Sequence, residues 1–310
     1  MPREVPEFPV FIEPPDLAPF MEGNTGVQGF WTRDSGLAGP HVVLVSLIHG
    51  NETAGATVLA ALLRDAFVPL RGRLTLGFAN LAAFARFDAA NPVASRFVEE
   101  DLNRVWDDAQ LFGVRQSLEL DRARQIRPLI DSADILLDLH SMLWPSDPLL
   151  LCGPAPRGLA LAEQLATPAM IVADAGHAGG KRLIDYGHFT SQEGHAAGIL
   201  VEAGQHWEPG AVAQTDATVR ALLRHAGMLA GTHQPDPPLV AEVVLAITAR
   251  TNRFVFTRPF RGGEIIGQAG TVIAHDGETE IRTPFAKCLL VMPSLRVSLG
   301  HTAVRLGRIK

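Results

Sequence analysis

The sequence predicts an α/β protein with a doubly wound, mostly parallel sheet, followed by a smaller, all-β, barrel-like module. In the first part, apolar runs rich in β-branched residues, such as 42–48, alternate with helical patterns, such as 53–67. This alternation is typical of a parallel sheet with helices on both faces. The stretch THQPDPP at 232–238 then permits neither a helix nor a central strand, and short β-like runs follow it at close spacing. We therefore expect two domains, residues 1–235 and residues 236–310.

The individual elements follow from local patterns. Residues 1–40 are rich in proline and glycine and predict irregular chain or a hairpin at one edge of the first domain. The strands expected after them are 42–48, 73–80, 134–140, 148–152, 169–173 and 197–202, and the expected helices are 53–67, 115–132, 157–166 and 211–229. The long segment 81–106 has little periodicity and predicts a functional loop, and the glycine-rich segment 174–194 predicts a second loop over the site.

Composition excludes several classes of partner. The 27 basic and 33 acidic side chains give a formal net charge of −6 with no basic run, which argues against nucleic acid or an acidic membrane surface as a partner. The first residues, MPREVPEFPVF, lack the basic start and apolar core of a signal peptide, and no window approaches a membrane span. Cys152 and Cys288 lie far apart in apolar surroundings, which is typical of buried thiols in a reducing compartment. We expect a cytoplasmic protein.

The run HVVLVSLIHGNE, residues 41–52, joins a strand that is buried on both faces to a loop carrying His49 and Glu52. Gly50 is expected to let the chain turn sharply, and Thr53 is expected to cap the helix that follows. Open α/β sheets bind their ligands at the carboxyl ends of strands. An imidazole and a carboxylate on one tight loop can face the same divalent ion, and they are two members of the His/His/Glu set that suits catalytic zinc.

Two further strands end in polar groups that complete such a site. His140 ends the strand DILLDLH, so adjacent parallel strands would bring its imidazole to the same sheet edge as His49. Asp138 lies two residues earlier on the same face, where its carboxylate can fix the tautomer of a ligand imidazole. Glu202 closes a third strand and could deprotonate a water molecule that zinc activates.

The ordered motifs HGNE, DLNR, DLH and VEAG resemble those of the succinylglutamate desuccinylase and aspartoacylase family, relatives of the zinc carboxypeptidases. The resemblance covers residues 41–305, because the C-terminal module also looks like the lipoyl-type β-barrel of that family. It implies a sheet of zinc-carboxypeptidase type, one Zn²⁺ per chain, a small N-acylated amino acid as substrate, and deacylation by amide hydrolysis; a homo-oligomer is possible. The implied roles are zinc binding by His49, Glu52 and His140, general base catalysis by Glu202, oxyanion stabilisation by Arg96, and carboxylate binding by Asn103 and Arg104.

Two departures from the family pattern bear on the substrate. Aspartoacylases have a substrate-binding arginine about ten residues before the catalytic glutamate, and this chain has Gln192 there. They also place tyrosines around the substrate, whereas Tyr186 is the only tyrosine here, so N-acetylaspartate is not the expected substrate. Relatives that act on other N-acyl amino acids, including the N-acetyl-diaminobutyrate deacetylase of ectoine breakdown, remain open. The candidates for reading the rest of the substrate are His177, Lys181, Arg182, His188 and Gln192.

Two alternative functions remain from the sequence. A metallocarboxypeptidase could use the same residues on peptides, and a panel of dipeptides beside N-acyl amino acids separates the two. A catalytically silent binding homologue predicts stoichiometric metal without turnover. The turn AHDGET at 274–279 lacks the lysine that lipoyl and biotinyl domains modify, so we expect the C-terminal module to form a wall of the site or an oligomer contact instead.

Overall fold

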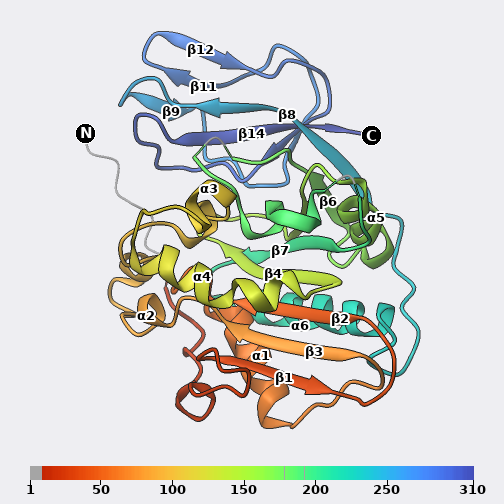
Figure 1. Cartoon of the computed structure of the whole chain (residues 1–310). Coiled ribbons are helices and arrows are strands. Elements are labelled where there is room, and N and C mark those ends of the chain that lie inside the picture. Colours follow the sequence, from red (N-terminus) through yellow and green to blue (C-terminus); the bar gives the residue numbers. More distant parts are fainter. Residues whose placement is uncertain (1–8, 178, 192) are drawn as a thin grey trace.

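The protein is described from a computed structural model, which places residues 9–177, 179–191 and 193–310. An 11-stranded mixed sheet runs through the chain (Figure 1). The strands 73–78, 41–46, 135–142 and 197–205 are parallel neighbours, and the strand 149–152 pairs antiparallel with the last of them. In spatial order the strands are β1 (Phe30–Asp34), β3 (Arg73–Phe78), β2 (His41–Ser46), β4 (Ile135–Met142), β7 (Ala197–Gln205), β5 (Leu149–Cys152), β6 (Met170–Ala173), β8 (Leu239–Thr248), β14 (Thr302–Ile309), β13 (Cys288–Val291) and β10 (Ile265–Ile266). The predicted α/β class with a smaller β module is confirmed.

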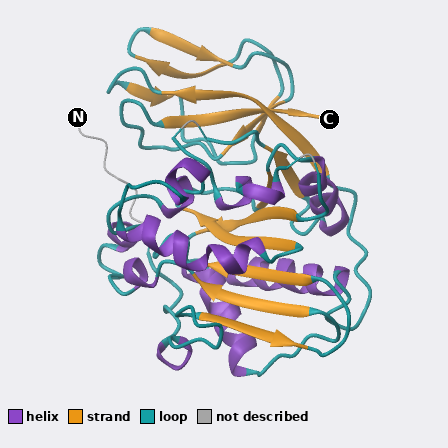
Figure 2. Ribbon diagram, viewed as in Figure 1, coloured by secondary structure: helices purple, strands orange, loops and turns teal. Residues whose placement is uncertain are grey.

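Helices cover both faces of the parallel part of the sheet (Figure 2). One face packs against α1 (Thr53–Arg64), α5 (Pro156–Leu165) and α6 (Pro209–His225), and the other packs against α4 (Leu118–Asp131). Alternate residues of β2 enter the two cores: Leu44 lies in the cluster with α1, and Val43 lies in the cluster with α4. The continuous apolar run of β2 is therefore explained by burial on both faces. Two short helices, α2 (Leu81–Phe84) and α3 (Asp108–Leu111), lie in the connections.

Strand β8 joins the large sheet to the C-terminal module. Its first residues pair in parallel with β6, and from Ala241 onward it pairs antiparallel with β14. A separate sheet is formed by β9 (Phe254–Phe256), β11 (Val272–Asp276) and β12 (Thr279–Arg282). The module has its own apolar core, which includes Phe254, Ile273 and Leu290. The division at residue 235 stays a prediction; the two parts share one sheet, because β8 pairs with β6 on one side and with β14 on the other.

Several expected element boundaries are corrected. Strand β1 pairs antiparallel with β3 at one edge, so the N-terminal region contributes an edge strand rather than a hairpin of its own. Strands β4 and β7 continue beyond His140 and Glu202 to Met142 and Gln205 because their mutual pairing continues past these residues. Thr53 is the first residue of α1 and does not cap it; Glu52 occupies the cap position without a side-chain cap hydrogen bond. Among the described helices, none has the length and hydrophobicity needed to cross a bilayer.

Candidate active site

The loop after β2 is held in an unusual backbone path. The chain leaves the sheet at Leu47, whose φ of 56° lies in the left-handed region that residues other than glycine rarely adopt. The chain turns sharply at Gly50 as expected, since the Glu52 N–H donates to the His49 carbonyl oxygen at 3.1 Å. The φ of Gly50 does not lie in the left-handed region; a side chain is excluded here by space, because a Cβ would lie 2.4 Å from backbone atoms of Ala83 and Phe84. The Gly50 N–H donates to the Arg96 carbonyl oxygen at 3.0 Å. This bond fixes the loop against the segment that carries Arg96.

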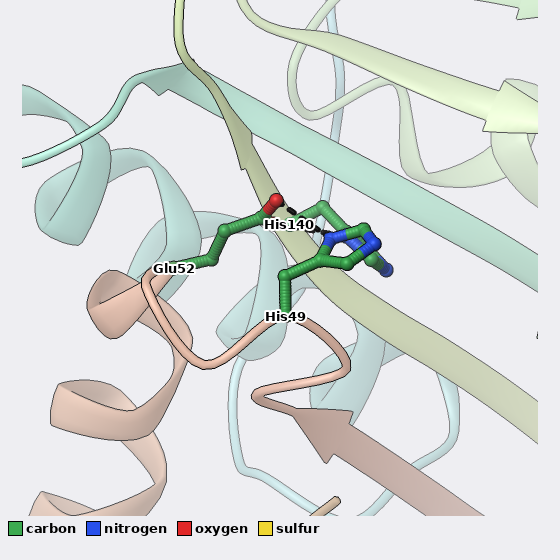
Figure 3. A group of neighbouring side chains, drawn as sticks. All are labelled: His49, Glu52 and His140. Carbon is green, nitrogen blue, oxygen red and sulfur yellow. Dashed lines mark hydrogen bonds and ion pairs between the residues drawn. The ribbon is translucent and has the colours of Figure 1, made fainter. Parts of the chain in front are cut away.

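His49, Glu52 and His140 converge in one buried group (Figure 3). Because β2 and β4 are adjacent and parallel, the loop after β2 meets the end of β4 at the same sheet edge. Glu52 lies between the imidazoles: its Oε1 is 2.7 Å from His49 Nδ1, and its Oε2 is 2.9 Å from His140 Nδ1. One potential ligand atom from each residue lies within 4.8 Å of the other two. The geometry therefore brings together the three side chains predicted as metal ligands.

Two aspartates face the remaining nitrogens of these imidazoles. Asp138 Oδ2 lies 2.9 Å from His140 Nε2, and Asp101 Oδ1 lies 2.9 Å from His49 Nε2. A carboxylate in this position favours the tautomer in which Nε2 carries the proton and Nδ1 presents its lone pair. Both Nδ1 atoms then face the same point beside Glu52. Asp138 was expected from its position two residues before His140, whereas Asp101 was missed, although it is the first residue of the DLNR motif.

Arg96 lies at the rim of this group. Its Nη1 donates to Glu52 Oε1 at 3.3 Å and its Nη2 donates to Asp101 Oδ2 at 3.1 Å. The same Nη2 lies 2.8 Å from His49 Nε2. When Nε2 carries a proton for Asp101, this last contact is a close approach of two donors rather than a hydrogen bond. The guanidinium is partly exposed, so it can also reach a group bound in the cavity above it.

Electrostatics keep the group charged despite its burial. Burial has the largest influence on the pKa of Glu52 and raises it, but His49 and His140 together outweigh it and hold this pKa well below its usual value. Burial lowers the pKa of His140, but Asp138 and Glu52 outweigh it and hold the pKa well above 6.5. A divalent cation would replace the proton of His140 and satisfy the Glu52 carboxylate. Two imidazoles and one carboxylate are a donor set that fits catalytic zinc.

Glu202 lies beside the group on β7, in register with His140 on β4. It is 9% exposed, and its Oε2 is buried with no hydrogen-bond partner among the described residues. Burial first, and the neighbouring Glu52 carboxylate second, raise the pKa of Glu202 to about 8. An unpartnered buried carboxyl with a raised pKa is suited to accept and return a proton near neutral pH. A cation held by the neighbouring residues would lower this pKa.

The group lies at the junction of two cavities that share His49, Arg96, Glu202 and Met292. The smaller, of about 170 Å³, has an apolar wall from the segment 142–145 after β4. The larger, of about 540 Å³, is lined by charged side chains: Arg96, Asp101, Arg104, Asp174, Arg182, Glu202 and Arg305. A small polar molecule in the large cavity therefore lies within reach of the catalytic candidates.

The remaining substrate-binding candidates fall into two groups. Asn103, Arg104, His177 and Arg182 line the large cavity. Asn103 accepts a hydrogen bond from Leu183 N–H at 2.8 Å through its Oδ1, so its amide nitrogen is left for a ligand. Arg182 is buried and its Nε donates to Asp185 at 2.7 Å. Its main role is therefore to support the loop that contains both residues, and not to bind a substrate.

The other candidates lie away from the group. His188 Nε2 lies 3.0 Å from the Ala133 carbonyl oxygen, which precedes β4 and so lies at the opposite sheet edge, and His188 lines neither cavity. Its expected contact with substrate has no support in this geometry. Lys181 is exposed and pairs with Asp107 at 3.4 Å. Gln192 lies outside the residues that the structure describes.

Sequence reasoning also missed His206 and Arg305. Ser141 Oγ lies 2.6 Å from His206 Nδ1, and His206 Nε2 faces the small cavity, 4.0 Å from Glu52 Oε1. Burial lowers the pKa of His206 to about 4, so its ring is neutral. His206 follows VEAG closely enough to be noticed, but Arg305 lies about a hundred residues further on in the C-terminal module, where no motif marks it.

The fold and the buried His/Glu/His group define a mixed α/β protein with a candidate catalytic metal centre. Residues 38–226, more than half of the chain, match the family model of the succinylglutamate desuccinylase/aspartoacylase catalytic domain. The chain belongs to this family. Membership supports a deacylase, that is, a hydrolase of amide bonds.

Individual relatives agree with this assignment. The succinylglutamate desuccinylase of Burkholderia cenocepacia is 26% identical over 303 residues, which cover 90% of this chain and 84% of that protein. The crystal structure of succinylglutamate desuccinylase from Vibrio cholerae matches with a TM-score of 0.69 at 20% identity, covering 91% of this chain and 86% of that one. The product-bound ectoine utilization protein from Ruegeria pomeroyi matches with a TM-score of 0.63 at 18% identity, covering 87% and 85%. At these identities the two structures show a shared fold only.

Proposed function

We propose that this protein is a zinc-dependent deacylase that hydrolyses the amide bond of a small N-acylated amino acid. The observation that carries the proposal is the buried group of His49, Glu52 and His140 beside the unpartnered carboxyl of Glu202. Family membership supports the reaction class. The charged cavity of about 540 Å³ beside the group supports a small polar substrate.

His49, Glu52 and His140 would hold the zinc ion, which would supply Lewis-acid polarisation and lower the pKa of an attacking water to about 7. Asp101 orients the imidazole of His49 through a hydrogen bond at Nε2, and Asp138 lies within ion-pair distance of His140 Nε2, although this contact lacks hydrogen-bond geometry. Both carboxylates would help to keep the two imidazoles in place before a substrate arrives.

Glu202 acts as the general base, takes the proton of the attacking water on its carboxylate, and returns it to the nitrogen of the departing amine. Without metal, burial raises the pKa of Glu202 to about 8, and a bound cation would lower it, so that the carboxylate could accept a proton near neutral pH and return it. Arg96 donates to the oxygen of the tetrahedral species, because its guanidinium lines both cavities at the metal group. Asn103 and Arg104 bind a carboxylate of the amino acid in the large cavity.

The test begins with metal content by elemental analysis of the purified protein beside His49→Ala. About one zinc per chain, lost in the variant, supports the metal site. Turnover of N-acyl amino acids, but not of dipeptides with a free amino terminus, then supports the deacylase over a carboxypeptidase. Stoichiometric zinc with no turnover in either panel would favour a catalytically silent binding homologue and refute the proposal.

A further inference from the structure

The large cavity contains more positive charge than its own acidic residues neutralise. Arg104, Arg182 and Arg305 all line it, and they come from three segments far apart in the sequence. Asp185 pairs closely with Arg182, and Asp174 is shared between Arg182 at 3.4 Å and Arg305 at 3.1 Å. With Arg96, four guanidinium groups line the cavity beside the carboxyl groups of Asp101, Asp174 and Glu202, and Asp101 pairs with Arg96.

Arg104 has no carboxylate within ion-pair distance in the described part of the chain. Its one hydrogen bond there goes from Nη1 to the backbone oxygen of Asn103 at 2.7 Å. Burial has the largest influence on the pKa of Arg104 and lowers it. Asp101 raises this pKa, but the nearby Arg96, Arg305 and Arg182 lower it, and the pKa lies below its usual value. A partly buried guanidinium without a carboxylate partner costs free energy until an anion pairs with it.

Arg305 reaches the same cavity from β14 of the C-terminal module. Its side chain is 12% exposed, and the ion pair with Asp174 uses the inner nitrogen Nε. The two outer nitrogens have no partner among the described residues, so they remain available to a ligand. Burial is the main influence that lowers the pKa of Arg305, and Glu202 is close enough to raise it in part. Arg305 therefore lies within electrostatic range of the proposed general base.

We infer that Arg104 and Arg305 together form a carboxylate-binding subsite, in which Arg305 is a specificity-determining residue that the C-terminal module contributes to the active site. The planar fork of a guanidinium matches a carboxylate, and two forks can hold it from two sides. Asp174 orients Arg305 by binding its inner nitrogen. The inference rests on the proposed function for the identity of the substrate, but the charge excess that carries it does not depend on any reaction.

The kinetic test uses the best N-acyl amino acid of the panel and analogues in which each carboxylate is replaced in turn by a carboxamide. Arg305→Ala should lower kcat/KM for the carboxylate substrate by about 10- to 100-fold, mainly through KM, which is the range for a hydrogen bond to a charged group. In the same variant, kcat/KM for one of the carboxamide analogues should change by less than about threefold, because that analogue already lacks the carboxylate that Arg305 would bind. Arg305→Lys, which keeps the charge, should recover part of the loss.

Arg308→Ala is the matched control, because Arg308 lies on the same strand, is exposed and stacks on Phe285 outside the cavity. Arg308→Ala should leave kcat/KM unchanged for all of these substrates. If Arg305→Ala lowers the rates on carboxylate and carboxamide substrates by the same factor, or if Arg305→Lys recovers nothing, Arg305 is only a structural ion pair and the inference is wrong.

A binding measurement separates this inference from the deacylase proposal. Glutarate has carboxylates but no amide bond, and its binding can be followed by calorimetry without turnover. Weaker binding to Arg305→Ala than to Arg308→Ala supports the subsite even if no amide is hydrolysed. If the wild-type protein hydrolyses no substrate of the panel, the deacylase proposal is refuted. If, in addition, glutarate binds Arg305→Ala and Arg308→Ala with equal affinity, or binds neither of them, the subsite is refuted as well.

Discussion

Replacing Glu202 by glutamine tests two consequences of one buried carboxyl. The side chain is 9% exposed and has a buried oxygen with no partner among the described residues, so glutamine fits the same space. Glutamine cannot accept a proton, and loss of a positioned general base typically costs about 10² to 10⁴ in rate. We expect kcat to fall by that factor while KM changes little, because Glu202 is proposed to act on water and not on the bound substrate.

The same change should stabilise the metal-free protein at high pH. The pKa of Glu202 is raised from 4.5 to about 8, so between these values the folded state holds a proton that the unfolded state has released. Stability then falls as pH rises, by about 1.4 kcal/mol per pH unit. The stability gained by Glu202→Gln over wild type should therefore grow from near zero at about pH 5 to an upper limit on the order of 5 kcal/mol at about pH 9.

The assay is urea unfolding of both proteins in the presence of a chelator, at several pH values, beside steady-state kinetics of the zinc-loaded proteins. Comparing the two proteins at each pH removes the contribution of all other titrating groups. A stability difference that does not change with pH would contradict the argument from burial. A variant that keeps the wild-type kcat would refute the role of Glu202 as base, whatever its effect on stability.

Three further predictions concern the metal group and its supports. His49→Ala should lower zinc content from about one per chain to near zero, and calorimetry in buffers of different ionisation enthalpy should show that wild type releases protons on binding zinc and binds it more tightly as pH rises. Gly50→Ala should destabilise the protein by about 1–3 kcal/mol, because the new methyl group overlaps neighbouring backbone, whereas Gly267→Ala, where the space is open, should change thermal unfolding little. Arg182→Ala removes the partner of the buried Asp185, leaves Asp174 with Arg305 alone, and should cost about 3–5 kcal/mol in urea unfolding. Arg220→Ala removes an exposed helical pair and should cost about 0.5 kcal/mol or less; equal losses in the two arginine variants would show that burial is not what makes Arg182 important.

The convergence of His49, Glu52 and His140 was predictable because local sequence determines it almost completely, whereas their binding of a metal stays a prediction. His49 and Glu52 lie on one tight loop, and His140 lies near the end of a neighbouring strand. Once the chain is assigned to a parallel sheet, the carboxyl ends of adjacent strands must meet at one edge. A strand boundary that is wrong by two residues, as for β4, does not change which edge the side chain reaches.

The groups around the metal ligands were less predictable because their positions depend on the path of loops. Asp101 reaches His49 from a segment 52 residues away, and no periodic pattern places that segment. The need for glycine at position 50 was predictable only in part for a similar reason: the turn was expected, but the backbone that leaves no space for a Cβ comes from α2, whose approach to the loop is a tertiary contact. His188 was assigned to the site from its place in a glycine-rich loop, but the loop passes to the other edge of the sheet before the chain enters β7.

The two cavities differ in how far their lining residues could be predicted from the sequence. The chemistry at the metal group depends on a few side chains fixed by strands, so its residues form short motifs. The charge of the large cavity depends on Arg104, Arg182 and Arg305, each from a different segment, and β8 is what ties the last of these to the main sheet. A substitution at Arg305 alters the charge of the cavity without touching a metal ligand. The inferred subsite predicts that the substrate can be changed independently of the reaction, and that the C-terminal module is one of the places where that change is made.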